Sequence, residues 1–424
     1  MSLSRRDFLT TSAATTACLA LSARALGTAT LRVASAQPTP DSKSTPAAPT
    51  KKLKLLILGG THITGPFLVR LALARGHTVT TFNRGKTEKR IGALPDSVEK
   101  LIGDRDPKIG EGLKALEGEG GRTWDAVIDT SGQVPRIVRA SCELLSKRCS
   151  HYTYISSISA YKPGMPKNSD ESAALCTLEP GDEVDLRKDM SNYGGLKAAC
   201  ERVVEEVYKG RCANIRPTFI SGPGDDTDRF GYFPIRVSRG GEMIAPGTPT
   251  DPMQFIDSRD LAAWLLHIAE NNVTRTYNAA GPHPACTIGE LLDISKEVSK
   301  SNATFTWVPA DFIEHPDAPA TSPARGMSIW ITPDGDDTGM STIKIDKAIA
   351  AGLKCRPIRE TVKDTLEWWP KEIERRTRVG KELVEQAKTD GKEPPKLPPS
   401  EELRAGPTAE EEKALLAAWH AKKK

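Results

Sequence analysis

The chain lacks several features that would assign it to a simple class of protein. No apolar run without charged residues reaches the roughly 20 residues that a membrane-spanning helix needs. None of its eight cysteines forms a Cys-x-x-Cys pair, and no cysteine–histidine cluster has the spacing of a zinc site. We therefore expect buried thiols and no metal site. The glycines and prolines follow no Gly-X-Y period, which excludes a collagen-like chain.

The composition that is present suits a large globular protein. The chain has 424 residues, of which 38% are apolar and 27% charged, so it can bury a sizeable core. The formal net charge is +4, which taken alone hints at an anionic partner.

The first 36 residues resemble a twin-arginine (Tat) export signal. Arg5 and Arg6 precede Phe-Leu and a mildly apolar stretch, and Ala34-Ser35-Ala36 has the form of a cleavage site. This resemblance implies the Tat export machinery as a partner and a periplasmic or other extracytoplasmic destination. The alternative is a short amphipathic helix with two chance arginines. Residues 37–50 are rich in Pro, Ser and Thr and are expected to form a flexible linker.

Removal of this signal changes the charge of the protein. Residues 1–36 contain four arginines and one aspartate, a net +3, which leaves +1 for the mature chain. No stripe of basic and aromatic residues compensates for this low charge, so no nucleic-acid partner is expected.

A glycine-rich turn lies between an expected strand and an expected helix. Residues 53–58 form an apolar run typical of a buried parallel strand, and apolar residues recur at helical spacing over residues 66–75. Residues 59–65, which join them, read Gly-Gly-Thr-His-Ile-Thr-Gly. Glycines there let the backbone approach a pyrophosphate, whose charge the helix N-terminus stabilises. The pattern predicts a βαβ unit that binds a dinucleotide.

The second expected strand, residues 79–82, informs the choice of cofactor. It is followed by Asn83 and Arg84. An acidic residue at this place would bind the ribose 2′-hydroxyl of NAD, whereas Arg84 suits the 2′-phosphate of NADP. We therefore expect NADP or NAD, with NADP slightly favoured.

Residues suited to carbonyl chemistry follow in order along the chain. A strand-like segment, residues 151–155, leads into a serine-rich stretch, and Tyr193 and Lys197 share one face of an expected helix. A free tyrosine has a pKa of about 10, and a nearby ammonium would lower it so that the phenol can act as an acid or base. The alternative is a solvated helix face with a surface tyrosine.

Together these motifs resemble the extended, epimerase/dehydratase-like branch of the short-chain dehydrogenase/reductase family. The glycine turn is similar to that branch's Gly-Gly-Thr-Gly-Phe-Ile-Gly, with His62 in the place of the middle glycine. Atypical relatives, including chloroplast stem-loop RNA-binding proteins, also carry a large residue there. Segments 214–224, 253–262, 277–281 and 287–291 continue the resemblance, which spans about residues 53–370. It implies an α/β fold with a doubly wound, Rossmann-type parallel sheet.

The resemblance also implies roles for individual residues. Tyr193 would be the acid/base, Lys197 would tune it and bind the nicotinamide ribose, and Ser157 would orient the substrate oxygen. The residues implied to bind the dinucleotide are Gly59, Gly60, Thr61, His62, Ile63, Thr64, Gly65, Asn83, Arg84, Asp104, Thr130, Ser131, Tyr193, Lys197 and Pro217.

The rest of the chain should bind the substrate and close the domain. We expect an NAD(P)-binding domain over residues 51–375 and a substrate lobe mainly at 223–251 and 283–345. A helical C-terminal extension over residues 376–424 should follow. Candidates for a substrate phosphate site, or alternatively for a solvated basic face, are Arg229, Arg236 and Arg239, with Gln254 nearby. The loop between Ser157 and Tyr193 is long enough to act as a lid.

The combined hypothesis is an exported NAD(P)-dependent oxidoreductase or epimerase. It would act by hydride transfer on a hydroxyl or carbonyl of a small sugar-like or nucleotide-sugar substrate, and the resemblance is compatible with a homodimer. The alternative is a non-catalytic dinucleotide-binding or RNA-binding protein on the same fold.

Overall fold

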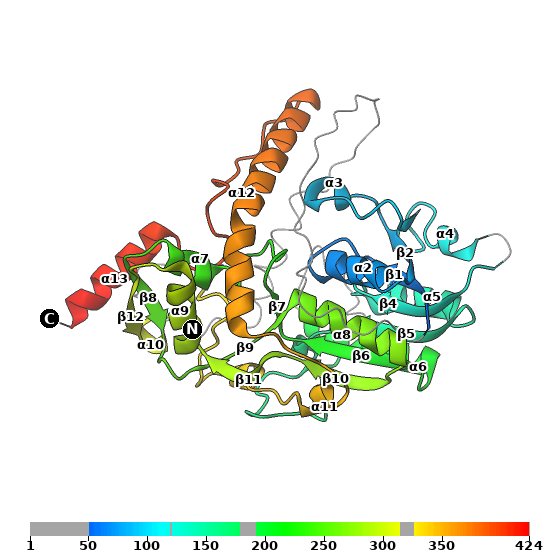
Figure 1. Cartoon of the computed structure of the whole chain (residues 1–424), viewed down its shortest axis with the longest axis horizontal. Helices are drawn as coiled ribbons and strands as arrows, with labels where there is room; N and C mark the ends of the chain where they lie inside the picture. Colours follow the sequence, from blue (N-terminus) through cyan, green and yellow to red (C-terminus); the bar gives the residue numbers. More distant parts are fainter. Residues whose placement is uncertain (1–50, 119–120, 179–191, 314–325, 424) are drawn as a thin grey trace.

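The computed structural model describes residues 51–118, 121–178, 192–313 and 326–423 (Figure 1). The expected signal and linker lie outside the described residues. So do residues 179–191 of the expected lid and residues 314–325 of the expected substrate lobe.

Within the described residues, seven strands form one sheet. They are β1 (Lys54–Leu58), β2 (Thr78–Asn83), β3 (Glu99–Ile102), β4 (Trp124–Asp129), β5 (Cys149–Ile155), β6 (Cys212–Pro217) and β10 (Arg275–Ala279). Their order is β10-β6-β5-β4-β1-β2-β3, and every neighbouring pair is parallel. The chain leaves β1 for β2 on one side and later adds β4 on the other. Ligands of open α/β sheets bind at such a switch point, beyond the carboxyl ends of the strands.

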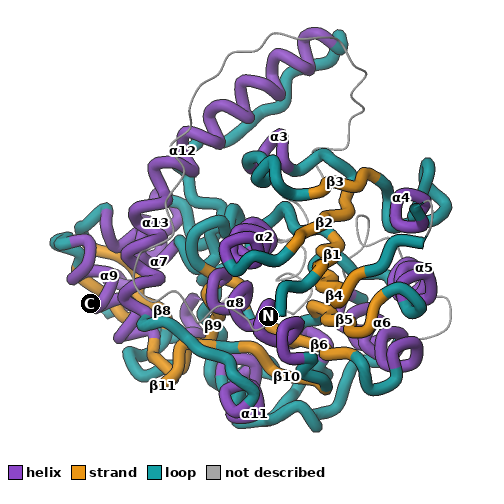
Figure 2. Tube along the Cα trace, turned by 45° about the vertical axis from the view of Figure 1, so that its right-hand side comes forward, coloured by secondary structure: helices purple, strands orange, loops and turns teal. Residues whose placement is uncertain are grey.

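Helices cover both faces of this sheet (Figure 2). The helices of this part are α2 (Thr64–Ala74), α3 (Glu88–Ile91), α4 (Lys114–Glu117), α5 (Pro135–Leu145), α6 (Tyr193–Tyr208), α8 (Ser258–Asn271) and α11 (Asp346–Ala350), with the short 3-10 helix η1 (Ile158–Ala160). Strand β1 shows why two layers of helices are needed. Leu55 and Ile57 pack with α2 and α8, whereas Leu56 and Leu58 pack with α5 and α6 on the opposite face. The Rossmann-type fold expected from the sequence is confirmed.

The substrate lobe contains two small sheets, ordered β11-β9-β7 and β12-β8. Its strands are β7 (Phe219–Ser221), β8 (Glu242–Pro246), β9 (Pro252–Asp257), β11 (Gly281–Thr287) and β12 (Thr304–Val308). Its helices are α7 (Tyr232–Ser238), α9 (Ile288–Ser299), α10 (Ala310–Ile313), α12 (Ile358–Thr389) and α13 (Ala409–Lys422), with the 3-10 helix η2 (Thr338–Ser341). One apolar cluster joins these elements and includes buried Phe230, Phe233 and Trp419.

The C-terminal extension packs on the substrate lobe of its own chain. In α13, the Trp419 ring lies 4.9 Å from the Phe312 ring, and Leu415 is fully buried. Helix α12 runs without a break past Pro370, so the boundary expected at residues 375 and 376 falls within one helix (Figure 1). No helix in the described part of the chain is both long and apolar enough to cross a bilayer.

Candidate active site

The glycine turn has the conformation that close approach to a ligand requires. Gly59 and Gly60 have φ angles of 96° and 75°, a region that residues with side chains rarely adopt. A Cβ atom on Gly65 would lie 2.4 Å from the carbonyl carbon of Gly60, so the helix can start against the turn only with glycine here. Ile63 precedes α2 and gives the helix no side-chain cap. Gly65 N donates to His62 O at 2.9 Å and Pro66 has no amide hydrogen, so in this first turn the Thr64 amide is the one left for another acceptor.

Two side chains from neighbouring strand ends hold this turn. The Thr130 hydroxyl accepts a hydrogen bond from Gly60 N at 3.1 Å and donates to Leu58 O at 2.9 Å. The Asn83 amide donates to Gly59 O at 3.3 Å and accepts from Gly85 N at 2.8 Å. Thr130 and Asn83, both expected at the cofactor, thus shape the glycine turn as well.

His62 takes a direction that the sequence left open. Its side chain turns toward the substrate lobe, where Nε2 lies 2.9 Å from Asp226 Oδ1. Asp226 is largely buried. Burial opposes its ionisation, but the bond to His62 and the charges of Arg375 and Arg404 hold its pKa well below the usual value.

A buried ion pair organises the loop after β4. Arg105 Nη1 lies 2.5 Å from Asp129 Oδ1 and 3.2 Å from Ser131 Oγ. The same Asp129 oxygen accepts the backbone amides of Ser131 and Gly132 at 3.0 and 2.9 Å, and Tyr152 donates to Oδ2 at 2.8 Å. Burial opposes ionisation of Asp129, but Arg105 and these donors keep its pKa below the usual value. The sequence interpretation missed Arg105, whose signal was a lone arginine between Asp104 and Asp106.

Three more residues expected to bind the dinucleotide, Arg84, Asp104 and Pro217, lie at or just after the ends of strands. They differ in how exposed they are. Arg84 is exposed directly after β2. Asp104 is partly buried, and its Oδ1 accepts the amide of Asp106 at 2.9 Å. Pro217 ends β6 in a buried position. Arg84 is thus accessible to a ribose phosphate, while Asp104 already has one acceptor atom engaged.

Ser157 and Tyr193 meet at the carboxyl end of the sheet. Ser157 follows β5 and caps the 3-10 helix η1, whose Ser159 amide donates to its hydroxyl at 3.0 Å. Tyr193 is the first residue of α6, and its hydroxyl lies close enough to Ser157 for a hydrogen bond from that side chain to act on its pKa. Burial raises the pKa of Tyr193 above its ordinary value, although this hydrogen bond and the charge of Arg229 act in the opposite direction.

Lys197 lies one turn further along α6 and points into the protein. Its ammonium donates to Gly132 O at 2.9 Å and to Ile155 O at 2.5 Å, and it lies 4.4 Å from the centre of the Tyr154 ring. Burial lowers the pKa of Lys197 to about 8. This corrects the expectation that Lys197 lowers the pKa of Tyr193. The ammonium is engaged by two backbone carbonyls, and burial governs the tyrosine.

Two buried hydroxyls at this edge of the sheet are unpartnered among the described residues. They are Thr64 Oγ1 at the start of α2 and Ser156 Oγ after β5. Buried polar atoms normally have partners, so unpaired ones beside a glycine turn indicate a polar ligand. Together with the uncapped start of α2, they show that the residues present fit a bound dinucleotide.

Comparisons with known proteins agree with this geometry. Residues 55–280, more than half of the chain, match the model of the NAD dependent epimerase/dehydratase family. The chain belongs to this family. Residues 2–22 match the model of the twin-arginine translocation pathway signal, so the chain carries a Tat signal that directs export to the periplasm or extracytoplasmic space.

Relatives of this epimerase/dehydratase chain are distant. It is 29% identical over 230 residues to the chloroplast stem-loop binding protein of 41 kDa b from Arabidopsis thaliana. That match covers 51% of this chain and 55% of the relative, about half of each.

Solved structures share the fold at low identity. A putative epimerase from Burkholderia cenocepacia is 18% identical, with a TM-score of 0.54 over 76% of this chain and 98% of that one. The Bordetella bronchiseptica enzyme WbmG, solved with NAD and UDP, is 14% identical with a TM-score of 0.55 over 76% and 95%. MoeE5, solved with UDP-glucuronic acid and NAD, is 17% identical with a TM-score of 0.51 over 75% and 99%.

In this family member, most of the polar residues expected to bind substrate phosphates serve the fold. Arg236 Nε lies 2.6 Å from Glu412 Oε2 of α13, and Arg239 donates to a backbone carbonyl of the C-terminal segment at 2.7 Å. The amide of Gln254 is buried and exchanges two hydrogen bonds of 2.9 Å with the backbone of Ile343. These three side chains are therefore engaged by the chain itself.

Arg229 is placed differently from the other two arginines. Its Nε donates to Thr227 Oγ1 at 2.9 Å, and its guanidinium lies 5.7 Å from the centre of the Phe219 ring. Its charge acts on the Tyr193 hydroxyl. Among the arginines considered for the substrate, Arg229 is thus the one whose charge acts on Tyr193.

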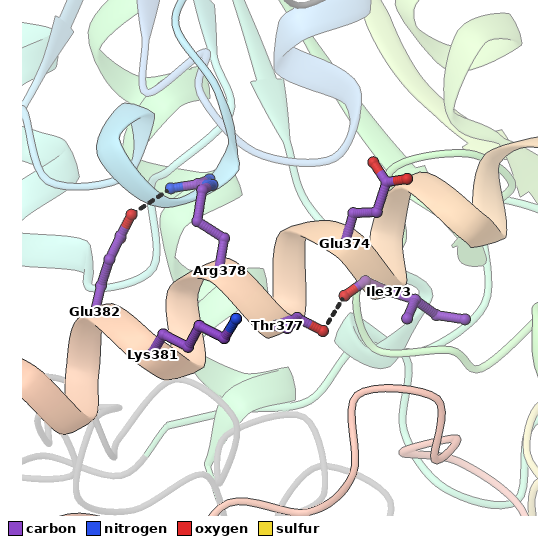
Figure 3. Close-up of a pocket in the computed structure, with 6 residues that line it drawn as sticks. All are labelled: Ile373, Glu374, Thr377, Arg378, Lys381 and Glu382. Atoms are coloured by element: carbon purple, nitrogen blue, oxygen red, sulfur yellow. Dashed lines mark hydrogen bonds and ion pairs between the residues drawn. The ribbon is translucent and has the colours of Figure 1, made fainter. Parts of the chain in front are cut away.

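A separate hollow of about 510 Å³ lies along α12, away from these strand ends (Figure 3). Residues of one face of α12 line it, among them Arg378, which pairs with Glu382 at 2.8 Å. The hollow is open and combines charges of both signs, so we assign it no part in the chemistry.

Proposed function

We propose that this exported family member is an NAD(P)-dependent oxidoreductase or epimerase that uses Tyr193 as its acid/base. The observation that carries the proposal is that the side chains of Ser157 and Tyr193 come together at the carboxyl edge of the parallel sheet, close enough for Ser157 to act on the pKa of Tyr193. A substrate oxygen placed beside both hydroxyls would be oriented by Ser157 and would exchange its proton with Tyr193.

The dinucleotide would lie along the glycine turn, residues 59–65, and reach the strand ends at Thr130 and Ser131. When bound, its nicotinamide supplies a hydride acceptor or donor. As a substrate hydroxyl becomes a carbonyl, Tyr193 in its phenolate form would take the hydroxyl proton and the substrate carbon would give up a hydride to the nicotinamide. In the reverse direction, Tyr193 returns the proton to the oxygen. This step is shared by oxidation, reduction and epimerisation.

Lys197 would support this step from inside the protein, by holding the segments around the site in place. Its bonds to Gly132 O and Ile155 O tie the loops after β4 and β5 to α6, which carries Tyr193. In this arrangement Lys197 fixes the two loops that flank the nicotinamide end.

We further propose that the substrate is a small sugar-like or nucleotide-sugar molecule. Relatives of the same fold were solved with UDP or UDP-glucuronic acid, and Arg229 offers a cation whose charge acts on Tyr193. NADP and NAD both remain within the proposal, with Arg84 favouring NADP. Mass spectrometry of the dinucleotide and small molecule released when the native protein is denatured would identify both.

Replacing the tyrosine tests the chemistry. Tyr193→Phe should lower the rate of hydride transfer about 10²- to 10⁴-fold, because it removes the acid/base, and should leave dinucleotide affinity nearly unchanged. Tyr208→Phe is a matched control, since Tyr208 ends the same helix and its buried hydroxyl has no partner among the described residues. Single-turnover formation of reduced nicotinamide is the measurement, and full turnover by Tyr193→Phe would refute the mechanism.

A second candidate is a non-catalytic dinucleotide-binding or RNA-binding protein. The observation in its favour is the 29% identity to a chloroplast stem-loop binding protein. Against it stands the charge of only +1 that the sequence gives the mature chain. Tight RNA binding that weakens steeply with salt, together with no turnover in the wild type, would favour this candidate.

A further inference from the structure

The glycine turn is joined directly to the substrate lobe by one side-chain contact. His62, at the centre of the turn, bonds through Nε2 to Asp226 Oδ1 at 2.9 Å. The His62 side chain is 46% exposed and that of Asp226 16%, so the pair bridges two parts of the protein at their surface. A glycine at position 62 could not make this contact.

The loop that carries Asp226 is held from behind by the C-terminal extension. Arg404 donates through Nη1 to Asp226 O at 2.9 Å and through its backbone amide to Asp228 Oδ2 at 2.9 Å. Arg376 of α12 pairs with the other Asp228 oxygen at 2.6 Å and with Glu372 at 2.8 Å. Arg376 and Asp228 are almost completely buried, so this support is fixed.

Gly224, two residues before Asp226, lies where the same loop comes close to the turn. A Cβ atom on Gly224 would lie 3.7 Å from Ile63 O, within van der Waals contact of the glycine turn. The loop of residues 224–228 therefore lies against the turn at the place where the pyrophosphate of a dinucleotide would bind.

We propose that His62 and Asp226 form a clasp over the pyrophosphate end of the dinucleotide site, held closed by the C-terminal extension, which slows release of the cofactor. The inference rests on the proposed function, because it requires a bound dinucleotide. A protein exported in its folded state gains from such retention, since free dinucleotide is scarce outside the cytoplasm. His62 and Asp226 act here as retaining residues and take no part in hydride transfer.

Release rates of NADH and NADPH test the clasp. The mature full-length chain would be loaded with either dinucleotide and chased with an excess of the oxidised form, and loss of bound fluorescence followed in time. His62→Ala and Asp226→Ala should each speed release about tenfold, the change expected for one charge-assisted hydrogen bond. The double variant should be no faster than the single ones, because both remove the same contact. Additive effects would overturn the clasp.

A separate variant and a control test the support that the C-terminal extension gives to the loop carrying Asp226. Arg404→Ala keeps His62 and Asp226 but frees the loop, so it should also speed release. In the same variant, amide hydrogen exchange in residues 225–228 of the cofactor-free chain should also become faster. Lys413→Ala changes an exposed residue of α13 and should alter neither measurement.

The outcomes separate this inference from the proposed function. A wild-type chain that binds neither NADH nor NADPH overturns both proposals. Binding with unchanged release rates in the His62, Asp226 and Arg404 variants overturns the clasp alone. Faster release in these variants, with the release rate of Lys413→Ala equal to that of the wild type, supports the clasp as a retaining device.

Discussion

The buried pair of Arg105 and Asp129 offers a decisive test of how this site is built. Asp129 is fully buried and the Arg105 side chain is only 11% exposed. Removing one partner of a buried ion pair leaves an uncompensated charge, at a cost of about 3 to 5 kcal/mol. We therefore expect Arg105→Met to lower the free energy of unfolding by this amount at neutral pH. Urea denaturation is the assay.

A matched control lies in the same segment. Arg136 pairs with Asp106 through two bonds of 2.8 and 2.7 Å, but its side chain is 42% exposed. Because such a pair is well solvated, Arg136→Met should cost only about 1 kcal/mol or less.

The pH dependence of the Arg105→Met variant sharpens the prediction. In the wild type the pKa of Asp129 is lowered, so its contribution to stability is present above the unfolded pKa and is lost as the pH falls through the folded value. Without Arg105, burial raises this pKa above the unfolded value. The cost of the substitution should then shrink between about pH 7 and pH 4.5, as Asp129 binds a proton. A cost below about 1 kcal/mol, or one equal at both pH values, would refute the assignment.

Two further predictions concern the glycine turn and the buried lysine. Gly65→Ala should weaken dinucleotide binding at least about tenfold by calorimetry, because its Cβ would lie 2.4 Å from Gly60, whereas Gly380→Ala in α12 should bind as the wild type does. The pKa of Lys197 is about 8 in the folded chain and near 10.4 in the unfolded chain, so the unfolded lysine binds more protons between these values and the Lys197 contribution to stability should rise with pH. Buried thiols such as Cys142 and Cys149, whose pKa values are raised, oppose this rise equally in both proteins. The difference in urea midpoint between the wild type and Lys197→Met should therefore move in favour of the wild type from about pH 7.5 to 9.5; an equal difference at both pH values would contradict the assignment.

Local patterns in the sequence determined the fold of the nucleotide-binding part. The apolar run at residues 53–58, the glycine turn and the following helical spacing predicted β1 and α2, which the structure has at Lys54–Leu58 and Thr64–Ala74. Such features can be read from the chain because strand, turn and helix depend on neighbouring residues. The Tat signal was readable for the same reason, and its match to the signal model confirms it.

The partners of charged side chains were decided only by the tertiary structure. Arg236 and Arg239 were candidates for a substrate site, but the folded chain directs them to the C-terminal extension. Residues 236 and 412 are far apart in sequence, and no local pattern records that they meet. The same holds for His62 and Asp226, which are 164 positions apart.

The electrostatic state of the site also required the folded structure. The sequence placed Tyr193 and Lys197 on one helical face and so predicted a lowered tyrosine pKa. The structure keeps the shared helix but buries both groups, and burial raises the pKa of Tyr193 and lowers that of Lys197. Spacing along a helix fixes which residues share a face, whereas a pKa depends on everything that packs around the group. The sequence by itself therefore determined the fold, the export signal and the candidate residues. The tertiary structure decided which of their charges reach the site, because burial and distant partners exist only in the folded chain.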